Sequence, residues 1–529
     1  MALPWYTEHT MSERFYLTTP IYYVNAEPSV GSTYTTVLVD AVTRYHRLFG
    51  QQARMLTGTD EHGDKVAQAA AAFGVTPLEY ATRISDAFRN TWPHFGIAND
   101  DFIRTTEPRH AKVVQSILQT VYDKGEIYFG EYGGLYCYGC ERFYTEKELT
   151  DGKCPQHLVV PTYISEKNYF FRMSAYQDWL IRLLEEQPDL VRPEQYRREV
   201  LGFLREPLED LCISRPTSRL TWGIPLPFDE NYVTYVWFDA LINYVTALDY
   251  PDGVLYRDYW PVAEHVIAKD ILKPHAIYWP CMLKAAGIPI YQHLNVHGYW
   301  TMGGQKGSKS VVAEGAVAEA MALFRKPLDL VERFGADGAR YVLLREMGFG
   351  GDSEFSPLGL IRRYNADLAH DLGNLANRVI NMTNRYCEGV VPDPPAEADA
   401  DRDLREAVIA APGAARAAIE AMLPHQALAE AMVLVKLTNG YLEHKAPWSA
   451  AKAGDRDGVA TTLYYAAEAL GVAAALLSPA MPEKMAALRV ALGLPETPRI
   501  GGWGQLDPGA RIGALPILFP KIEDPEHPA

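Results

Sequence analysis

The sequence predicts an α/β protein: a split, doubly wound (Rossmann-like) parallel sheet with a small inserted domain, followed by an all-α helical bundle. Three observations support this prediction. Runs of β-branched and aromatic residues alternate with helical patterns in the first part of the chain, as in parallel sheets whose strands are joined by helices. The alternation gives way to short aromatic runs with clustered cysteines, and then returns. Beyond about residue 357, Ala, Leu, Arg and Glu follow a helical period.

These changes in composition divide the chain into five segments. The Pro-rich stretch Val390–Asp403 is expected to cross between helices of the bundle. The expected segments are 1–121 and 230–300 for the two halves of the sheet domain, 122–229 for the inserted domain, 301–357 for a linker and 358–529 for the helical domain.

The first half of the sheet domain contains two strand-then-helix units. Arg14–Asn25 is rich in β-branched and aromatic residues and predicts a strand, and Thr33–His46 has a helical pattern. Gln52–Asp60 predicts a second strand, and Ala-rich helices begin near Lys65 and Pro77. Ligands of such sheets bind beyond the carboxyl ends of the strands. A site is therefore expected at the loops that follow these strands, Pro28–Ser32 and Gly58–Gly63.

The second half of the sheet domain shows the same alternation. Tyr232–Val245 and the stretches 264–275 and 289–298 each predict a strand followed by a turn or a helix. We expect all three strands to complete the parallel sheet.

Length and composition narrow the class of protein. The chain has 529 residues, of which 48% are hydrophobic and 22% charged, so disordered, collagen-like and membrane proteins are excluded. The formal charge of −16 means that a nucleic acid must be bound by a local basic patch. The N-terminus lacks a signal-peptide core, and the longest apolar stretch, Ala469–Met481, is too short to span a bilayer. We expect a soluble, cytoplasmic protein without a membrane partner.

A cluster of metal-ligand residues lies in the inserted domain. Two pairs with CxxC and CxxH spacing are separated by 13 residues, and only six cysteines occur in the chain. Such pairs suit one tetrahedral Zn²⁺ ion, which would be structural because four protein ligands leave no open position. The alternative is a reduced thiol cluster without metal. The predicted ligands are Cys137, Cys140, Cys154 and His157.

Two loops could bind anions. The first, Pro28–Ser32, opens a helix with small residues and hydroxyls, so backbone N–H groups would face an anion. Taken alone it is more simply a Pro-Ser helix cap. The second, Gly303–Ser310, combines glycines with Lys306 and Lys309. It suits a mobile phosphate clamp, and the alternative is a solvated glycine loop.

Aromatic residues around one carboxylate suggest a pocket for a small amphiphilic molecule. The carboxylate would pair with an ammonium group, and the rings would surround an apolar or thioether tail. The alternative is that most of these rings are ordinary core. The pocket candidates are Tyr23, Asp60, Trp237, Tyr244, His275 and Trp279.

In the helical region, Trp448 after Pro447 is either a stacking platform for bases or a buried anchor.

Several of these motifs together resemble the methionyl-tRNA synthetases, which are class I aminoacyl-tRNA synthetases. The resemblance runs nearly end to end. The motifs are TTPIYYVNAEP, LTGTDEHGDKV, the CxxC…CxxH knuckle, YVTYVWFDALINYV, KDILKPHAIYWP, LNVHGYWT, FGADGARYVLLRE, DLAHDLGNLANR, HKAPWSAAK and LLSPAMPEKM. The resemblance implies that 301–357 holds a KMSKS-like loop and a stem-contact linker and that 358–529 binds the anticodon. It also implies a monomer, because the dimerisation module of some relatives is absent.

The resemblance assigns a role to each candidate residue. It implies tRNA(Met), methionine and ATP with Mg²⁺ as substrates, and one structural Zn²⁺ per chain. Catalysis would fall to Ser29, Ser32, Lys306 and Lys309; ATP binding to Gly31, Asp270, Lys306, Ser308 and Lys309; methionine binding to Ile21, Tyr23, Asp60, Trp237, Ala240, Leu241, Tyr244, Ile271, His275 and Trp279; and anticodon binding to Asn374, Arg378, Pro447 and Trp448.

The nucleotide side departs from the family pattern. The HIGH signature is Ser29-Val-Gly-Ser32, and KMSKS is Lys306-Gly-Ser-Lys-Ser310. The usual glycine of the GKD segment is Ala268, and an extension follows Ser310. One lost donor typically costs about 10²–10³ in rate, so adenylation should be weakened. Three hypotheses follow: a methionine–tRNA ligase with altered catalysis, a paralogue that transfers an activated amino acid to an amine or peptide, and a non-catalytic protein that binds tRNA or methionine.

Overall fold

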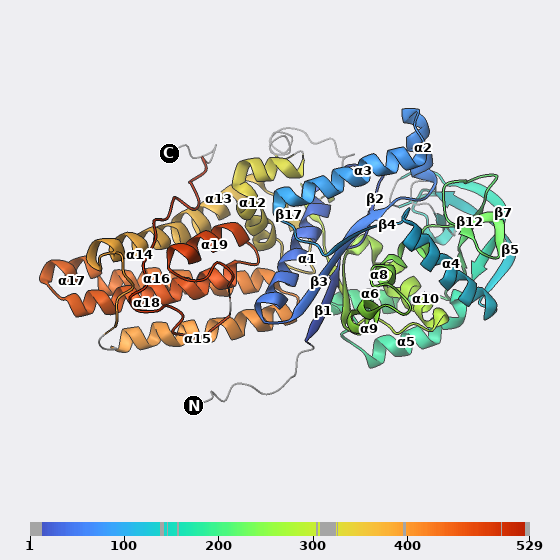
Figure 1. The fold of residues 1–529 in the computed structure, drawn as a ribbon. Coiled ribbons are helices and arrows are strands. Elements are labelled where there is room, and N and C mark those ends of the chain that lie inside the picture. Colours follow the sequence, from blue (N-terminus) through green and yellow to red (C-terminus); the bar gives the residue numbers. More distant parts are fainter. Residues whose placement is uncertain are drawn as a thin grey trace.

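A seven-stranded parallel sheet lies between a helical bundle and a small inserted domain (Figure 1). The computed structural model describes residues 13–137, 142–144, 146–155, 158–302, 305–306, 324, 326–394, 398–498 and 500–523. The fold class is therefore an α/β core with a C-terminal helical domain, as the sequence predicted.

The sheet joins two parts of the chain that are far apart in sequence. Its strand order is β2-β3-β1-β13-β14-β8, with β4 paired to β3, and every pairing is parallel. Thr18 on β1 pairs with Leu56 on one side and with His265 on the other. The strands are β1 (Arg14–Thr18), β2 (Tyr22–Tyr23), β3 (Gln52–Asp60), β4 (Asp101–Arg104), β8 (Val191–Arg192), β13 (Ala263–Ala268) and β14 (His293–His297).

The predicted strand over Arg14–Asn25 is in fact two strands. β1 ends at Thr18 and β2 begins at Tyr22. Pro20 lies between them and has no N–H to donate to a neighbouring strand. The strand over Gln52–Asp60 was predicted with its observed bounds.

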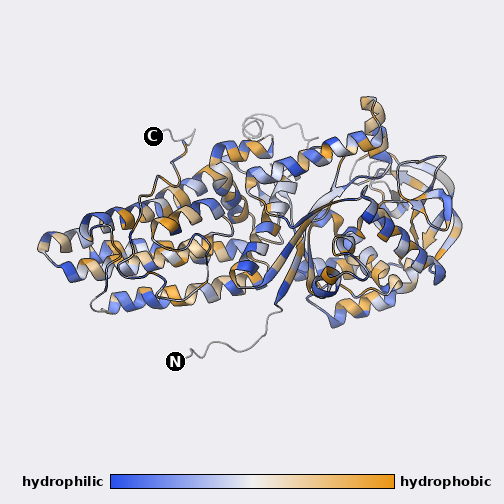
Figure 2. Ribbon diagram, viewed as in Figure 1, coloured by the Kyte–Doolittle hydropathy of each residue, from blue (hydrophilic) through white to orange (hydrophobic). Residues whose placement is uncertain are grey.

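Helices cover the faces of the sheet. They begin as predicted near Lys65 and Pro77, whereas the first helix begins at Val30, three residues earlier than its helical pattern. Hydrophilic and hydrophobic positions alternate along α3 and α15, as expected of helices with one buried face (Figure 2). The helices of this domain are α1 (Val30–Leu48), α2 (Asp64–Phe73), α3 (Pro77–Thr91), α4 (Pro108–Asp123), α7 (Trp237–Ala240), α8 (Asn243–Thr246), α9 (Val254–Tyr259) and α10 (Trp279–Ala286).

One predicted strand of the parallel sheet belongs elsewhere. The strand within Tyr232–Val245 is β12 (Asp229–Thr234), which pairs antiparallel with β10 (Ser214–Pro216) and β11 (Pro225–Leu226). The edge of the parallel sheet is instead β8, from the segment predicted as the insertion. Local pattern identifies a strand but not its partner, which depends on tertiary packing.

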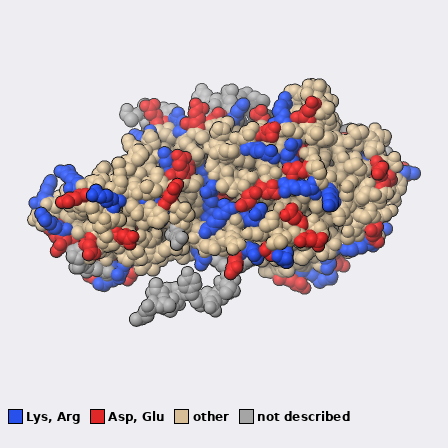
Figure 3. All heavy atoms as spheres, in the orientation of Figure 1, with Lys and Arg blue, Asp and Glu red and all other residues tan. Residues whose placement is uncertain are grey.

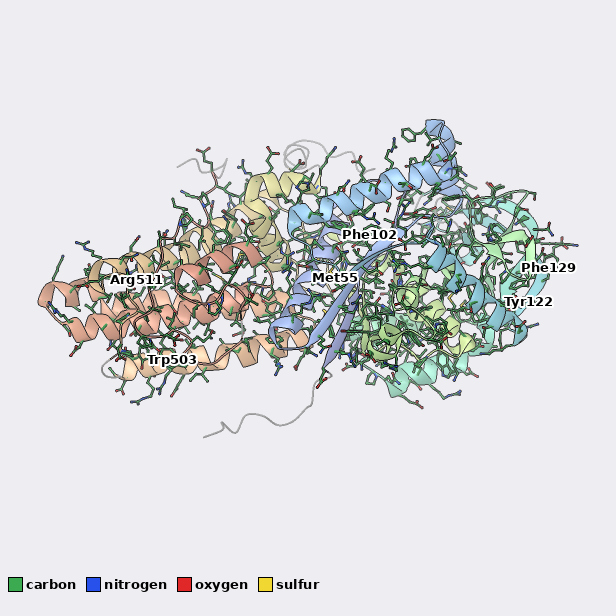
Figure 4. The ribbon with its side chains drawn as sticks, in the orientation of Figure 1. Met55, Phe102, Tyr122, Phe129, Trp503 and Arg511 are labelled. Atoms are coloured by element: carbon green, nitrogen blue, oxygen red, sulfur yellow. The ribbon has the colours of Figure 1, made fainter. Side chains whose placement is uncertain are left out.

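The inserted segment also carries a second antiparallel sheet and two helices. The sheet order is β6-β5-β7-β9. In Figure 4, Tyr122 at the end of α4 and Phe129 on β5 lie at this end of the molecule. The elements are β5 (Ile127–Cys137), β6 (Arg142–Tyr144), β7 (Thr162–Phe171), α5 (Gln177–Glu186), α6 (Glu194–Phe203) and β9 (Leu211–Cys212).

The C-terminal helices pack around α18, whose residues are nearly all buried. This helix is long and apolar enough to cross a membrane, but here it is the central core helix of the bundle. A linker sheet, β15 (Trp300–Met302), β16 (Gln305–Lys306) and β17 (Ser353–Glu354), precedes the bundle. The helices are α12 (Pro327–Glu346), α13 (Pro357–Arg363), α14 (Gly373–Tyr386), α15 (Asp399–Glu420), α16 (Pro424–Lys445), α17 (Pro447–Ala453), α18 (Arg456–Leu477) and α19 (Pro482–Ala491).

A buried arginine joins the bundle to the sheet domain. Arg340 on α12 contacts Asp40 of α1 at 2.7 Å between Nη2 and Oδ2. Its guanidinium also donates to the carbonyls of Phe95, Pro479 and Ala480. Buried residues of α1, α12 and the bundle form one continuous core, so the two domains share a core.

The chain after α19 runs back over the bundle. Backbone N–H groups of residues 504–506 donate to the carboxylate of Glu468, which lies in α18. Further along, Asn365 exchanges two hydrogen bonds with Ile522. Trp503 and Arg511, which belong to this segment, are labelled over the helical bundle in Figure 4.

Candidate active site and RNA-binding groove

The serines that replace the HIGH signature cap helix α1. Ser29 is the N-cap, and its Oγ accepts from the N–H of Ser32 at 3.2 Å. The Oγ of Ser32 accepts from the N–H of Ser29 at 2.9 Å and donates to the Ser29 carbonyl. This reciprocal pair is a capping box, which explains why the helix begins early. Both hydroxyls already have backbone partners, and their role toward ATP stays a prediction.

Asp60 and Tyr23 lie side by side at the carboxyl end of the sheet. They are paired residues on β3 and β2, and Asp60 is largely buried. Gly58 brings this strand end close to β4, because a Cβ there would lie 2.1 Å from the carbonyl oxygen of Ile103. The Nζ of Lys65 lies 5.8 Å from the centre of the Tyr23 ring.

Aromatic side chains from the second half of the domain face one another nearby. Tyr244 Oη lies 2.8 Å from His275 Nε2, and the Tyr244 and Trp279 ring centres are 6.1 Å apart. Trp237 packs edge-on toward His275, with ring centres 6.4 Å apart. The structure thus brings together several predicted pocket residues. Ala240 and Leu241 are buried on and beside α7, and Ile21 and Ile271 pack against the same core as the rings.

The histidine of the predicted pocket is uncharged. His275 Nδ1 lies 2.9 Å from the carbonyl oxygen of Ile271, so Nδ1 carries the proton and Nε2 accepts from the Tyr244 hydroxyl. Burial lowers the pKa of His275 to about 4. His275 lies in a π-helical turn, Pro274–Tyr278, a feature that often marks functional sites.

Trp237 follows a strained residue. Val236 has φ +37° and ψ −86°, an outlier for a β-branched side chain. Such a conformation costs about 1–3 kcal/mol and persists only where the surroundings hold it. The position of Trp237 is therefore set by its environment.

The sequence did not single out Asp239, which links the two halves of this site. Its carboxylate accepts from His62 Nδ1 at 2.7 Å and from His110 Nε2 at 2.8 Å. Burial alone would raise the pKa of Asp239, but the two histidines lower it to about 2. Because His62 follows Asp60 by two residues and Asp239 follows Trp237 by two, this bridge ties the carboxylate loop to the segment carrying Trp237.

A second missed residue, His265, lies behind the aromatic wall. It is fully buried on β13, between Thr18 and Trp279. One signal was available: a histidine inside the apolar run that forms a central strand.

The nucleotide side is described only in part. Asp270 is exposed just after β13, and the neighbouring Lys269 contacts Asp352 at 2.7 Å. Burial, and then the carboxylates of Asp270 and Asp352, raise the pKa of Tyr299. Lys306 lies on β16. Ser308, Lys309 and most of the extension after Ser310, residues 311–323 and 325, lie outside the described residues.

A polar groove on the bundle contains two predicted anticodon readers. The groove has a volume of about 670 Å³. Arg378 lies over the Trp448 ring at 5.4 Å and pairs with Glu443 at 2.8 Å. A π-helical segment, Tyr364–Leu372, precedes the helix that carries both readers. Lys and Arg side chains lie at this end of the bundle, near α14 and α17, mixed with Asp and Glu side chains (Figure 3). Lining residues are His370, Asp371, Asn374, Asn377, Arg378, Asn381, Met382, Lys436 and Asn439.

Trp448 is the second residue of α17, which begins at Pro447. Pro447 is buried and Trp448 is partly exposed, so the proline anchors the turn and leaves the indole accessible. The distant α16 supplies Lys436 and Asn439, which sequence reasoning missed.

Two of the four predicted zinc ligands are described. Cys137 and Cys154 are buried in one cluster with Tyr144, and Cys154 Sγ lies 3.4 Å from Tyr144 Oη. Cys140 and His157 lie outside the described residues. Within the described parts of the chain, no group of three metal-ligating side chains is present. The two buried thiols fit a zinc knuckle, which stays a prediction.

Comparisons with known proteins place this fold and site in a class. The profile described as "tRNA synthetases class I (M)" matches residues 15–159 and 157–380. The "Anticodon binding domain of methionyl tRNA ligase" matches residues 391–529. The chain with this split parallel sheet is thus a class I aminoacyl-tRNA synthetase.

Comparisons with individual proteins identify the family within this class. A methionine–tRNA ligase of Deinococcus radiodurans is 43% identical over 97% of this chain and 75% of its own length. One from Streptomyces coelicolor is 40% identical over 98% of each chain. A crystal structure of Mycobacterium tuberculosis methionyl-tRNA synthetase bound by methionyl-adenylate matches with a TM-score of 0.90 and 37% identity, over 96% of this chain and 100% of that one. The chain belongs to the methionyl-tRNA synthetase family.

Proposed function

We propose that this protein is a methionine–tRNA ligase that forms methionyl-adenylate from methionine and ATP and transfers the methionyl group to tRNA(Met). The observation that carries the proposal is that Asp60, beside Tyr23 at the sheet edge, lies close enough to the aromatic cluster for its charge to add to the effect of burial in raising the pKa of Tyr244, in a chain of this family. The protein is expected to act in the cytoplasm. The domain boundaries predicted above belong to the same proposal.

The pocket supports methionine as the amino acid. The carboxylate of Asp60 can pair with the α-ammonium group, and the strand pairing holds it beside Tyr23. At the other end, Tyr244 and His275 offer neutral groups to the sulfur, because His275 is deprotonated and bonded to the hydroxyl. A charged side chain would lose its hydration there without a counter-charge. The wall therefore favours a thioether over a cationic or acidic side chain.

Adenylation then needs alignment more than covalent help from the protein. A methionine carboxylate oxygen attacks the α-phosphorus of ATP, the new O–P bond forms, and pyrophosphate leaves. Lys306 and Lys309 would close on the phosphates, and Asp270 would hold the ribose. Mg²⁺ arrives with ATP and neutralises phosphate charge. In the second step a terminal ribose hydroxyl of the tRNA attacks the activated carbonyl carbon, and AMP leaves.

The capped serines support weakened adenylation. Two hydroxyls that hold each other's backbone N–H groups are poor substitutes for imidazoles aimed at a phosphate. Each missing donor typically costs about 10²–10³ in rate. A Cβ at Gly31 would meet only Ser29 Oγ, at 3.7 Å. The protein itself therefore does not require glycine there, and close approach of a ligand would explain it.

The groove on the bundle supports tRNA as the acceptor. Arg378 lies over the partly exposed Trp448, so base stacking and a cationic contact are available together. Asn374 lines the same groove and can hydrogen-bond to base edges. Retention of this surface argues against the amide or peptide ligase, which would have no use for tRNA. The non-catalytic protein that binds tRNA or methionine is distinguished by its lack of pyrophosphate exchange.

The zinc knuckle would stabilise the inserted domain. Cys137, Cys140, Cys154 and His157 would hold one Zn²⁺, and the burial of the two described thiols is consistent with this. Bound zinc would cross-link this part of the inserted domain, where the buried cluster of described residues is small. The reaction itself would not pass through the metal.

Two assays on the purified chain test the function. ATP–pyrophosphate exchange with methionine should be measurable, and tRNA(Met) should become charged. Exchange without charging would indicate the amide or peptide ligase. Methionine binding by calorimetry without exchange would indicate the non-catalytic protein. Absence of methionine binding under any nucleotide or tRNA condition would refute the proposal.

A further inference from the structure

We propose that His265 is a specificity-determining positioning residue that supports Tyr244 and Trp279 from behind and so sets the depth of the methionine pocket. It does not itself touch substrate. This inference rests on the proposed function, because it assigns His265 to the layer behind the expected methionine site.

His265 is built into the most rigid part of the domain. It lies on β13, which has parallel neighbours on both sides, and it pairs in register with Thr18 of β1. His265, Thr18, Tyr244 and Trp279 are all at most 1% exposed. Residues on a central strand cannot shift without breaking two ladders of hydrogen bonds, so this histidine is a fixed reference point for the side chains that contact it.

Both ring nitrogens of His265 are used. Trp279 Nε1 donates to His265 Nε2 at 3.3 Å, and because an indole N–H can only donate, Nε2 carries no proton. Nδ1 then holds the proton and donates to Thr18 Oγ1 at 2.9 Å. The result is a neutral imidazole in one tautomer. The imidazole holds the indole of Trp279 through Nε1, which is the only polar atom of the tryptophan side chain.

The face of the same ring supports Tyr244. The two rings are tilted against each other, with centres 4.1 Å apart and planes at 30°. Tyr244 in turn donates to His275, so its ring is held by one histidine below and its hydroxyl by another. Tyr291 packs edge-on against His265 at 4.8 Å and donates to the His275 carbonyl at 2.8 Å. One imidazole thus contacts three aromatic side chains, two of which, Tyr244 and Trp279, belong to the predicted pocket.

Removing this support should change which side chain fits best. Without the imidazole, the indole N–H of Trp279 loses its partner and a void opens behind Tyr244. Both rings can then move away from the substrate. Methionine would lose contacts at its methyl end, whereas a side chain one methylene longer would gain room. The discrimination between methionine and ethionine therefore reports the role of His265.

The test compares His265→Ala with His265→Gln by ATP–pyrophosphate exchange with each amino acid. For His265→Ala we expect the KM for methionine to rise at least about tenfold, the cost of one buried donor left unpaired, while the KM for ATP stays within twofold. The ethionine-to-methionine ratio of kcat/KM should rise at least fivefold. His265→Gln keeps a side-chain amide that can serve both partners and should restore both values to within threefold. This ratio does not depend on the amount of active enzyme, so a merely structural defect would leave it unchanged.

His46→Ala is the matched control. His46 is also buried, and it bonds to Gln51 and stacks on Phe15 at the far end of α1. It should leave the ethionine-to-methionine ratio unchanged. If His265→Ala does not fold, Thr18→Val decides, because it removes only the acceptor for Nδ1 and should raise the ratio at least twofold.

An unchanged ratio and KM in folded His265→Ala, or in Thr18→Val if the former is unfolded, would overturn the inference. The wild type separates this failure from failure of the proposed function. If the wild type binds methionine and exchanges pyrophosphate, and the variants have the same KM and ratio, only the role of His265 is refuted. If the wild type neither binds methionine nor exchanges pyrophosphate, the proposed function is refuted.

Discussion

Restoring both imidazoles at the start of α1 should raise adenylation and weaken the helix cap at the same time. The change is Ser29→His with Ser32→His. Because one preorganised donor is typically worth about 10²–10³ in rate, and two in one network need not add, we expect ATP–pyrophosphate exchange to rise at least roughly tenfold.

The cost to the helix follows from the capping box. The substitution removes the acceptors of two backbone N–H groups, at 3.2 Å and 2.9 Å. Losing an N-cap serine costs about 0.5–2 kcal/mol, and here the value should lie near the low end because both groups are exposed and water can replace the hydroxyls. Amide hydrogen exchange at the first turn of α1 should accelerate accordingly.

A control separates the two effects. Ser29→Asn with Ser32→Gln keeps side chains suited to a capping box but adds no imidazole. The rate of ATP–pyrophosphate exchange should therefore change less than threefold. If the histidine variant is folded and its rate is unchanged, or if the control gains as much, the reasoning about missing imidazoles is wrong.

The remaining predictions concern the groove, the knuckle and the domain joint. Trp448→Ala should lower kcat/KM for tRNA charging by about 10- to 100-fold, since stacking on an aromatic side chain is worth about 1–3 kcal/mol per base, and should leave pyrophosphate exchange unchanged; an equal loss in both assays would contradict this. Metal analysis should find one zinc per chain in the wild type and less than half of that in Cys154→Ser, and no zinc in the wild type would remove the knuckle. Burial raises the pKa of Asp337 from 3.8 to about 6, so the folded chain binds more protons than the unfolded chain between these values, and the stability contributed by this group falls as pH rises from about 4 to 6, by at most ~3 kcal/mol. Asp337→Asn should therefore melt at a higher temperature than the wild type at pH 7.5, with the gap closing near pH 4, and a gap independent of pH would exclude this linkage.

Local sequence patterns predicted the elements whose form depends on their own residues. The strand Gln52–Asp60 had the expected bounds, because β-branched and apolar residues between clear turn signals need no distant information. The predicted strand over Arg14–Asn25 is interrupted at Pro20. The prediction missed this because it used only the pattern of apolar residues. β12 was assigned to the wrong sheet, because the choice of partner depends on contacts across the whole domain.

The candidate site shows the same limit. Residues in conspicuous motifs, such as Asp60 and His275, could be named from sequence. Asp239 and His265 could not, since their roles depend on partners more than 100 residues away, His110 for the first and Thr18 for the second. Lys436 lines the candidate anticodon groove only because α16 packs against the helix of Arg378.

The contacts of Arg340 limit how this chain can be dissected. Cutting it near residue 358 would give a sheet domain that keeps the guanidinium and Asp40 but loses the carbonyls of Pro479 and Ala480. The fragment would expose a strip of core that α1 and α12 normally share with the bundle. Such a truncated enzyme should aggregate, so experiments meant to isolate amino acid activation are better made with point variants of the intact chain than with its halves.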